Sequence, residues 1–139
     1  LVIAEGPAAR AVRASSSIPG IFEPARWEGR MLVDGGLLNN VPADIARAMG
    51  ADLVVGVDLN ADHFRSRPPE NILDVMLSSL YLLIRGASQQ AGRKADILVA
   101  PDLRGFSYHN LSRLEEMIAR GEQAMRAQLD ALRRRLQRR

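Results

Sequence analysis

The apolar residues of the chain fall into short runs that are separated by glycine, proline and polar residues. Short apolar runs between turn signals are typical of buried strands. The chain has such runs, each a predicted strand or strand end, at 1–4, 31–33, 53–57 and 97–100. Two longer stretches exceed the length of an ordinary strand and therefore predict helices: 72–84 and 111–139.

Proline and glycine mark the ends of two shorter predicted helices. Pro7 begins a helix over 8–14, because proline is favoured in the first turn of a helix. Pro42 begins a second helix, which Gly50 closes. This second helix lies between the second and third predicted strands, and a strand-helix-strand crossover of this kind predicts parallel strands in an α/β sandwich.

A carboxylate and two glycines, Asp34, Gly35 and Gly36, follow the second predicted strand. The residues at 27–30 are expected to form the hairpin turn that leads into this strand. The glycines can take positive φ and leave room for another group near the backbone. A carboxylate in such a place can accept a proton from a nucleophile within hydrogen-bond reach. The same three residues are also common in ordinary turns, so both interpretations remain open on these residues alone.

Three short motifs surround this loop. An Ala-Ser turn leads into Ile-Pro-Gly at 14–20, the Val-Asp-Gly-Gly loop with Asn-Asn-Val-Pro occupies 33–42, and Gly-Ala-Asp precedes an apolar strand at 50–57. In this order and spacing they resemble the C-terminal half of a patatin-like phospholipase domain. The likeness is to bacterial members, which are similar to the neuropathy-target-esterase catalytic domain. It is close over 6–58 and looser over 95–124.

The resemblance implies a fold and a chemistry. The fold would be α/β, a three-layer sandwich with a mainly parallel central sheet. Proteins of this family are serine acyl hydrolases that act on lipid carboxylic esters through a Ser-Asp dyad without histidine. The resemblance assigns the proton acceptor to Asp34 and the active-site loop to Gly35 and Gly36. It implies a lipid or acyl-ester substrate and no cofactor, and no metal is expected because His, Asp and Glu are not clustered at ligand spacing.

Further residues are expected to support the loop that carries the carboxylate. Asn39, Asn40 and Pro42 are expected to fix it through side-chain bonds to the backbone and a rigid helix start. Ser15 and Pro19 lie in the turn that packs beside the active site in the family. The resemblance therefore implies a structural role for Ser15 and Pro19 rather than direct catalysis.

The nucleophile of the family is missing from these residues. It lies in a Gly-x-Ser-x-Gly motif, and no serine of this chain is flanked by glycine on both sides at that spacing. The glycine-rich oxyanion loop of the family is also missing. We therefore expect residues 1–139 to be the C-terminal portion of one patatin-like domain, with its N-terminal half as a partner. The chain alone is expected to be inactive, because a base without a nucleophile and oxyanion donors retains little of the catalytic arrangement.

The composition is that of an ordinary globular domain. The 139 residues are 47% hydrophobic and 25% charged, with a net charge of +3 that sits largely in the arginines of 133–139. Cysteine is absent, which excludes disulfides and thiolate metal sites. No run reaches the roughly 18 apolar residues of a transmembrane helix. A cytoplasmic or membrane-peripheral location is favoured.

The apolar stretch at 72–84 leaves a second function open. Such a helix is either sandwiched between layers, paired with another copy in a homo-oligomer, or in contact with an acyl chain or a membrane surface. Together with the long C-terminal helix and basic tail at 111–139, it would form a non-catalytic lipid- or membrane-associated assembly module. Nucleic acid is not an expected partner, because aromatic residues make up only 4% of the chain and give no stacking platform.

Three other titratable residues, Asp58, His63 and His109, could in principle take part in catalysis. Asp58 ends the third predicted strand and is expected to cap the following loop. The chain contains two histidines, His63 and His109. Neither has a catalytic motif around it, so both are expected to be solvated rather than catalytic.

Overall fold

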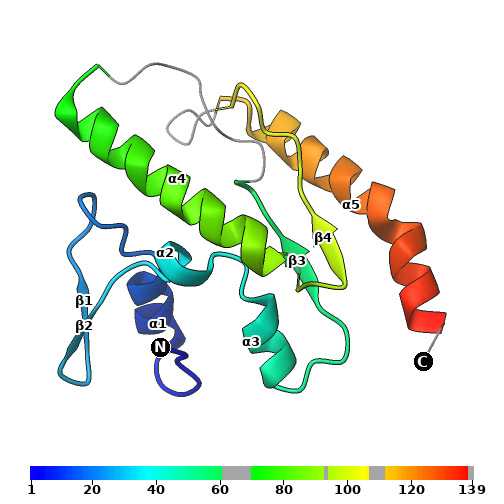
Figure 1. Ribbon diagram of the computed structural model, residues 1–139, viewed down its shortest axis with the longest axis horizontal. Helices are drawn as coiled ribbons and strands as arrows, with labels where there is room; N and C mark the ends of the chain where they lie inside the picture. Colours follow the sequence, from blue (N-terminus) through cyan, green and yellow to red (C-terminus); the bar gives the residue numbers. More distant parts are fainter. Residues whose placement is uncertain (61–69, 93, 107–111, 138–139) are drawn as a thin grey trace.

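The computed structural model describes residues 1–60, 70–92, 94–106 and 112–137 (Figure 1). In chain order the helices and strands are α1 (Ala8–Ser15), β1 (Ala25–Trp27), β2 (Arg30–Leu32), α2 (Gly36–Asn39), α3 (Ala43–Ala48), β3 (Val55–Val57), α4 (Ile72–Gly92), β4 (Ile97–Val99) and α5 (Leu114–Gln137). The described part is thus mixed α/β, as the sequence predicts. The three-layer arrangement stays a prediction.

The strands of the described part form two separate two-stranded sheets. β1 and β2 are antiparallel, with Trp27 opposite Arg30. Between them Glu28 and Gly29 have positive φ values of 47° and 76°. Two successive residues of positive φ are the mark of the tight hairpin turn whose twist matches that of the strands. The hairpin predicted at 27–30 is therefore confirmed.

The crossover after the hairpin does not place its two flanking strands in one sheet. β2 pairs with β1, whereas β3 pairs in parallel with β4. A two-residue turn permits only antiparallel pairing, so the hairpin commits β2 to β1. The prediction that this crossover would bring β2 and β3 into one parallel sheet is wrong for the described residues, and β3–β4 is the parallel pair that they contain.

The helices pack on the β3–β4 sheet and on the loop that follows β2. In Figure 1, α4 passes over α2, and α5 runs alongside β4. The buried apolar residues in this part of the chain are Val41, Ala43, Val54, Ile84, Ile97, Val99, Leu103 and Phe106. The contact between α4 and α2 places α4 next to the Asp34 loop, because α2 begins at Gly36 in that loop.

Apolar surface remains exposed on β3 and α4. The strand at 53–57 was expected to be buried on both faces, but Gly56 is buried while Val57 is 56% exposed. The reason is that α5 packs against β4 rather than over β3. Of the alternatives for the 72–84 helix, sandwiching between two layers is not what the described part shows, since its exposed side chains include Ile72, Leu73, Val75, Met76, Leu82 and Leu83.

The apolar run at 1–4 forms no strand. Leu1 and Val2 are exposed, and no strand of the described part pairs with this run. A strand without a neighbour leaves its backbone donors and acceptors to water, so an apolar sequence alone does not hold the extended conformation in a sheet. The expectation of a buried strand here is therefore wrong.

The carboxylate of Asp96 forms an ion pair between the segment before β4 and the long helix α5. Asp96 accepts hydrogen bonds from the guanidinium of Arg47 and from the backbone N–H of Val54, the latter at 3.0 Å. Its other oxygen lies 3.6 Å from the guanidinium of Arg135 in α5. The Val54 N–H, and after it Arg47, lowers the pKa of the Asp96 carboxyl below its usual range. Asp96 therefore connects α3, the start of β3 and the end of α5.

Candidate functional site

Asp34 lies two residues beyond β2, at the point where the chain turns into α2, and its side chain is half-buried. Its backbone N–H donates to the carbonyl of Ser17 at 2.9 Å. Its carboxylate Oδ1 accepts the backbone N–H of Gly36 at 2.7 Å. In the described part, Gly36 is the hydrogen-bond donor found for this carboxylate, so the second oxygen stays available to another group. The backbone thus holds the orientation of Asp34 while one oxygen keeps its accepting capacity.

Neither glycine after Asp34 has an unusual backbone angle, and only Gly36 is needed for its small size. Neither is among the glycines of positive φ, and Gly35 has helical angles of −67° and −22°. A Cβ at Gly36 would lie 2.9 Å from Asp34 Oδ1 and 2.8 Å from Asn40 Oδ1. A Cβ at Gly35 would meet only Ser15 Oγ, at 3.9 Å. Gly36 therefore makes room for the carboxylate, and the expected positive φ is not observed.

The Ala-Ser turn supports the Asp34 loop through Ser17, which the sequence did not single out. Ser15 is exposed, whereas Ser17 is buried. The Ser17 hydroxyl donates to the Arg13 carbonyl at 2.9 Å and accepts from the Arg13 guanidinium at 3.0 Å. Its carbonyl then receives the N–H of Asp34. The spacing of four residues between Arg13 and Ser17 was the available signal, because it places both on one helical face.

Pro19 lies in the turn that carries the chain from the serines toward the hairpin. It is half-buried, and Gly20 after it has a φ of +82°, a conformation that favours glycine. The N–H groups of Ile21 and Phe22 both donate to the Ile18 carbonyl, which closes this turn. In this structure Pro19 thus belongs to a turn beside the Asp34 loop.

The two asparagines after the loop bond to side chains rather than to the expected backbone groups. Asn39 Nδ2 donates to Asp44 Oδ1 at 2.8 Å. Lys94 also donates to this carboxylate, and Lys94 followed by Asn39 lowers the pKa of Asp44 to about 2. Asn40 Nδ2 donates to the hydroxyl of Ser88 at 2.9 Å. Pro42 precedes the first residue of α3, as predicted.

Two other sequence predictions concern residues outside this loop. Asp58 is buried and its Oδ1 accepts the N–H of Asn60 at 2.9 Å, which confirms that it caps the loop after β3. His63 and His109 lie outside the described residues. In the described part of the chain, His, Cys, Asp and Glu form no group of three that could hold a metal ion.

The part of the chain that contains this loop is similar to known proteins. Residues 3–47 match the model of the family described as patatin-like phospholipase. Over 59 residues the chain is 44% identical to patatin-like phospholipase domain-containing protein 7 of Rattus norvegicus, covering 41% of this chain and 4% of that protein. The corresponding protein 6 of Homo sapiens gives the same identity and coverage. An uncharacterized NTE family protein of Mycobacterium tuberculosis strain H37Rv is 29% identical over 150 residues, covering 91% of this chain.

Residues 3–47 of the chain form part of a patatin-like phospholipase domain. The chain spans 26% of the length of the mycobacterial relative and 4% of the mammalian ones. The patatin-like region at 3–47 includes α1, the β1–β2 hairpin, α2 and most of α3. Asp34 and the supporting residues Ser17 and Asn40 all lie inside it. Ser88, which receives the Asn40 amide, lies outside it in α4.

We expect the bond between Asn40 and Ser88 to stabilise the patatin-like loop. Ser88 is fully buried and donates its own proton to the Ile84 carbonyl, so Asn40 fills its accepting site. Asn40→Ala should lower the free energy of unfolding by about 1–3 kcal/mol, because it leaves a buried polar group without its partner. Urea unfolding of the protein expressed from its whole reading frame measures this change.

A double-mutant cycle separates this bond from the other effects of substitution. Ser88→Ala combined with Asn40→Ala should cost less than the sum of the single variants, because both remove one interaction. Ser79→Ala is the matched control, since Ser79 in α4 is exposed and bonds to the carbonyl of Val75 four residues earlier. Strict additivity of Asn40→Ala and Ser88→Ala would show that the bond contributes nothing.

Proposed function

We propose that this chain supplies the proton acceptor, Asp34, of a serine acyl hydrolase that cleaves carboxylic esters of phospholipids, lysophospholipids or other acyl lipids. The match of residues 3–47 to the patatin-like phospholipase family supports the class of reaction. The observation that carries the proposal is the Asp34 carboxylate itself, which is half-buried and anchored by Gly36 through one oxygen. A general base needs this combination of fixed position and free accepting capacity.

In the proposed reaction Asp34 takes the proton of a serine hydroxyl as that hydroxyl attacks the ester carbonyl. The proton then passes to the leaving alcohol, and water repeats the sequence on the acyl-serine. The serine and the donors for the tetrahedral oxyanion belong to the rest of the domain, because these 139 residues contain no Gly-x-Ser-x-Gly motif. Gly36 keeps the backbone close to Asp34, so that the nucleophile can approach. No cofactor enters this scheme.

The N-terminal half of the same domain is the partner that this function requires. Val55 and Val57 of β3 are exposed on one face of a parallel strand pair. Parallel sheets occur almost only with both faces covered, which favours a covering layer over β3. We infer that the other half of the domain packs there and completes a three-layer sandwich with a mainly parallel central sheet. Activity of the chain alone is accordingly not expected.

The test of this function is ester hydrolysis by the protein expressed from its whole reading frame. The substrate series should include a phospholipid, a lysophospholipid and a short-chain ester, and the assay is repeated after Asp34→Asn. Undiminished hydrolysis by the variant would remove Asp34 from the mechanism.

A second candidate function is a non-catalytic module that associates with lipid, a membrane or a second copy of the chain. The observation that favours it is the exposed apolar face of α4, which includes Met76, Leu82 and Leu83. None of the described helices has the length and apolar character needed to cross a bilayer. The exposed apolar face of α4 favours contact with the surface of a membrane, which is the form that we propose.

Vesicle binding by a Leu83 variant tests this second function. Leu83 is 68% exposed, so Leu83→Glu should leave the fold intact and weaken binding to anionic vesicles about tenfold or more, because a charge replaces buried apolar area. Cosedimentation measures the binding, which should also fall with salt and ignore Asp34→Asn. Gln123→Glu adds the same charge at an exposed site of α5 and is the control. Equal binding by a folded Leu83→Glu variant would argue against membrane contact.

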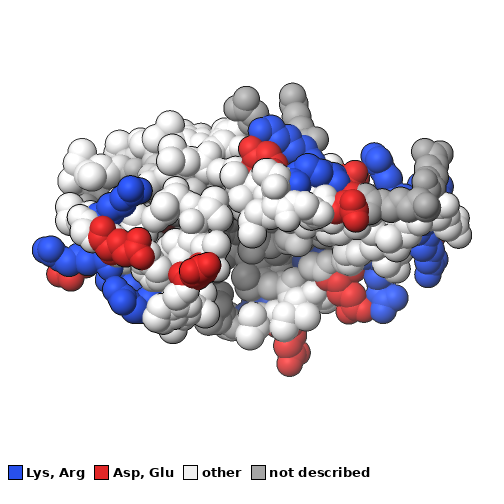
Figure 2. Space-filling model, turned by 90° about the horizontal axis from the view of Figure 1, so that it is seen from below, with Lys and Arg blue, Asp and Glu red and all other residues white. Residues whose placement is uncertain are grey.

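Nucleic acid is not part of either proposal. On the face shown in Figure 2, acidic side chains stand among the basic ones. The described residues of that face therefore offer no continuous basic track for a phosphate backbone.

A further inference from the structure

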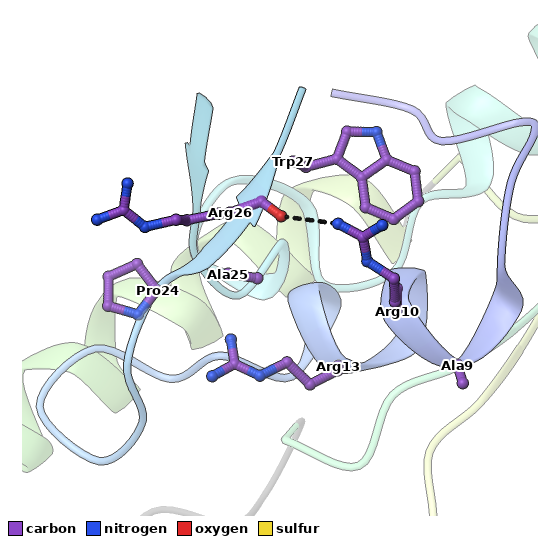
Figure 3. Close-up of a pocket in the computed structure, with 7 residues that line it drawn as sticks. All are labelled: Ala9, Arg10, Arg13, Pro24, Ala25, Arg26 and Trp27. Atoms are coloured by element: carbon purple, nitrogen blue, oxygen red, sulfur yellow. Dashed lines mark hydrogen bonds between the residues drawn. The ribbon is translucent and has the colours of Figure 1, made fainter. Parts of the chain in front are cut away.

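An open pocket of about 360 Å³ lies between α1 and the β1–β2 hairpin (Figure 3). It is lined by Ala9, Arg10, Arg13, Pro24, Ala25, Arg26 and Trp27. The alanines, the proline and the indole ring make part of its wall apolar, and the guanidinium groups make the rest strongly basic. No acidic residue lines it.

The three arginines of the pocket have no carboxylate partner among the residues that the structure describes. Arg10 donates to the backbone carbonyl of Arg26 at 3.3 Å, and Arg13 donates to the Ser17 hydroxyl. Elsewhere in the described part, six arginines pair with carboxylates: Arg47, Arg104, Arg113, Arg126, Arg133 and Arg135. The pocket therefore concentrates positive charge that the protein itself does not neutralise.

Two of these guanidinium groups are already held in place. The Arg10 guanidinium lies over the Trp27 ring, 5.3 Å from its centroid, and Trp27 is only 8% exposed (Figure 3). Arg13 is fixed by the buried Ser17. A donor that is ordered before binding loses less conformational entropy when a ligand arrives. The planar guanidinium also presents paired N–H groups that match the oxygens of a phosphate.

We propose that this pocket binds the phosphate monoester group of a ligand. A dianionic monoester matches the uncompensated basic charge, and the apolar part of the wall accommodates the carbon atoms attached to the ester oxygen. The pocket adjoins the Asp34 loop, since Arg13 bonds to Ser17 and the Ser17 carbonyl accepts the N–H of Asp34. The source of the monoester is either a soluble phosphate ester or a lipid headgroup. Binding at this pocket does not depend on Asp34 being catalytic.

Binding measurements on the protein expressed from its whole reading frame test the proposal. One arm is calorimetric titration with glycerol 3-phosphate. The other is cosedimentation with phosphatidylcholine vesicles that contain either phosphatidic acid, a monoester, or phosphatidylserine, a diester, at equal surface charge. Arg10→Gln combined with Arg26→Gln should weaken monoester binding about tenfold or more, because each substitution removes a charge-assisted donor. Asp34→Asn should leave it unchanged.

A matched control carries the same loss of charge outside the pocket. Arg30→Gln combined with Arg134→Gln removes two exposed arginines that do not line it, and should leave monoester binding within about twofold of the parent. Arg26→Gln alone keeps the Arg10 and Arg13 contacts and should still weaken binding, which covers the case of a double variant that fails to fold.

The titration and the vesicle cosedimentation together decide whether the pocket binds a monoester and from which source. Pocket-dependent binding of glycerol 3-phosphate supports the proposal with a soluble source, and pocket-dependent binding of phosphatidic acid vesicles alone supports it with a lipid source. The proposal is overturned if neither ligand binds, if the pocket and control variants lose binding equally, or if the pocket variant loses phosphatidylserine vesicle binding as strongly as phosphatidic acid vesicle binding.

Discussion

Asp34→Asn should reduce kcat/KM for an ester substrate by about 10²–10⁴-fold in the protein expressed from its whole reading frame, the usual contribution of a positioned general base. Asparagine keeps an oxygen that can accept the Gly36 N–H, which lies 2.7 Å from Asp34 Oδ1. It cannot accept the proton of a nucleophile, because its second terminal atom is an amide nitrogen. The loss should therefore fall on kcat rather than on KM, and steady-state kinetics separate the two.

Asp130→Asn is the matched control for this substitution. It removes the same charge from an exposed position in α5, where Asp130 pairs with Arg133 at 3.2 Å. Its kinetics should equal those of the parent, because surface ion pairs of this kind contribute little. If Asp34→Asn behaves like Asp130→Asn while both variants are folded, Asp34 is not the base and the proposed mechanism fails.

The local turn chemistry of the chain could be predicted from the sequence. The hairpin at 27–30, the end of α3 just before Gly50 with its φ of +95°, and the loop cap by Asp58 all appear where adjacent residues indicated them. Each depends on the conformational preferences or side chains of neighbouring residues, so a short window of sequence contains the whole cause. The role of Asp34 came instead from the family resemblance of its motif and the surrounding motifs, and it stays a prediction.

The partners that hold the site could not be predicted. Asn40 bonds to Ser88, which is 48 residues later in the chain, and only the packing of α4 on α2 brings them together. Ser17 was one of three adjacent serines, and the turn after α1 decides that it alone is buried. Which oxygen of Asp34 is engaged also depends on the start of α2 at Gly36. The Asn40–Ser88 contact follows from tertiary structure and leaves no local signal, whereas the spacing of Arg13 and Ser17 was a signal present in the sequence.

Burial was the property that the sequence predicted least well. The runs at 1–4, 53–57 and 72–84 are apolar enough to be buried, yet Leu1, Val57 and Leu83 are exposed. An apolar pattern states which side chains gain free energy from burial, but it does not say which element will cover them. In the described part α5 covers β4 and leaves β3 open. The proposed N-terminal half of the domain would provide the missing cover.

Gly56→Ala should destabilise the protein by about 1–3 kcal/mol, because it inserts a methyl group into a packed site. A Cβ at Gly56 would lie 2.8 Å from Val41 Cγ1 and 3.3 Å from the Ala95 Cβ. Val41 is 4% exposed and follows Asn40, so its displacement would reach the segment that supports the Asp34 loop. Urea unfolding measures the change in free energy, and the slope should stay constant if only stability changes.

The contrast with Gly86→Ala makes this prediction specific. Gly86 lies inside α4, and a Cβ there would meet nothing within 4 Å, so alanine should stabilise the helix by about 0.5–1 kcal/mol. The same chemical change is thus expected to have opposite signs at the two sites. Val41→Ala should relieve part of the cost of Gly56→Ala, because it removes the methyl group that the new Cβ meets. Stabilisation by Gly56→Ala would contradict the close packing of β3 against Val41.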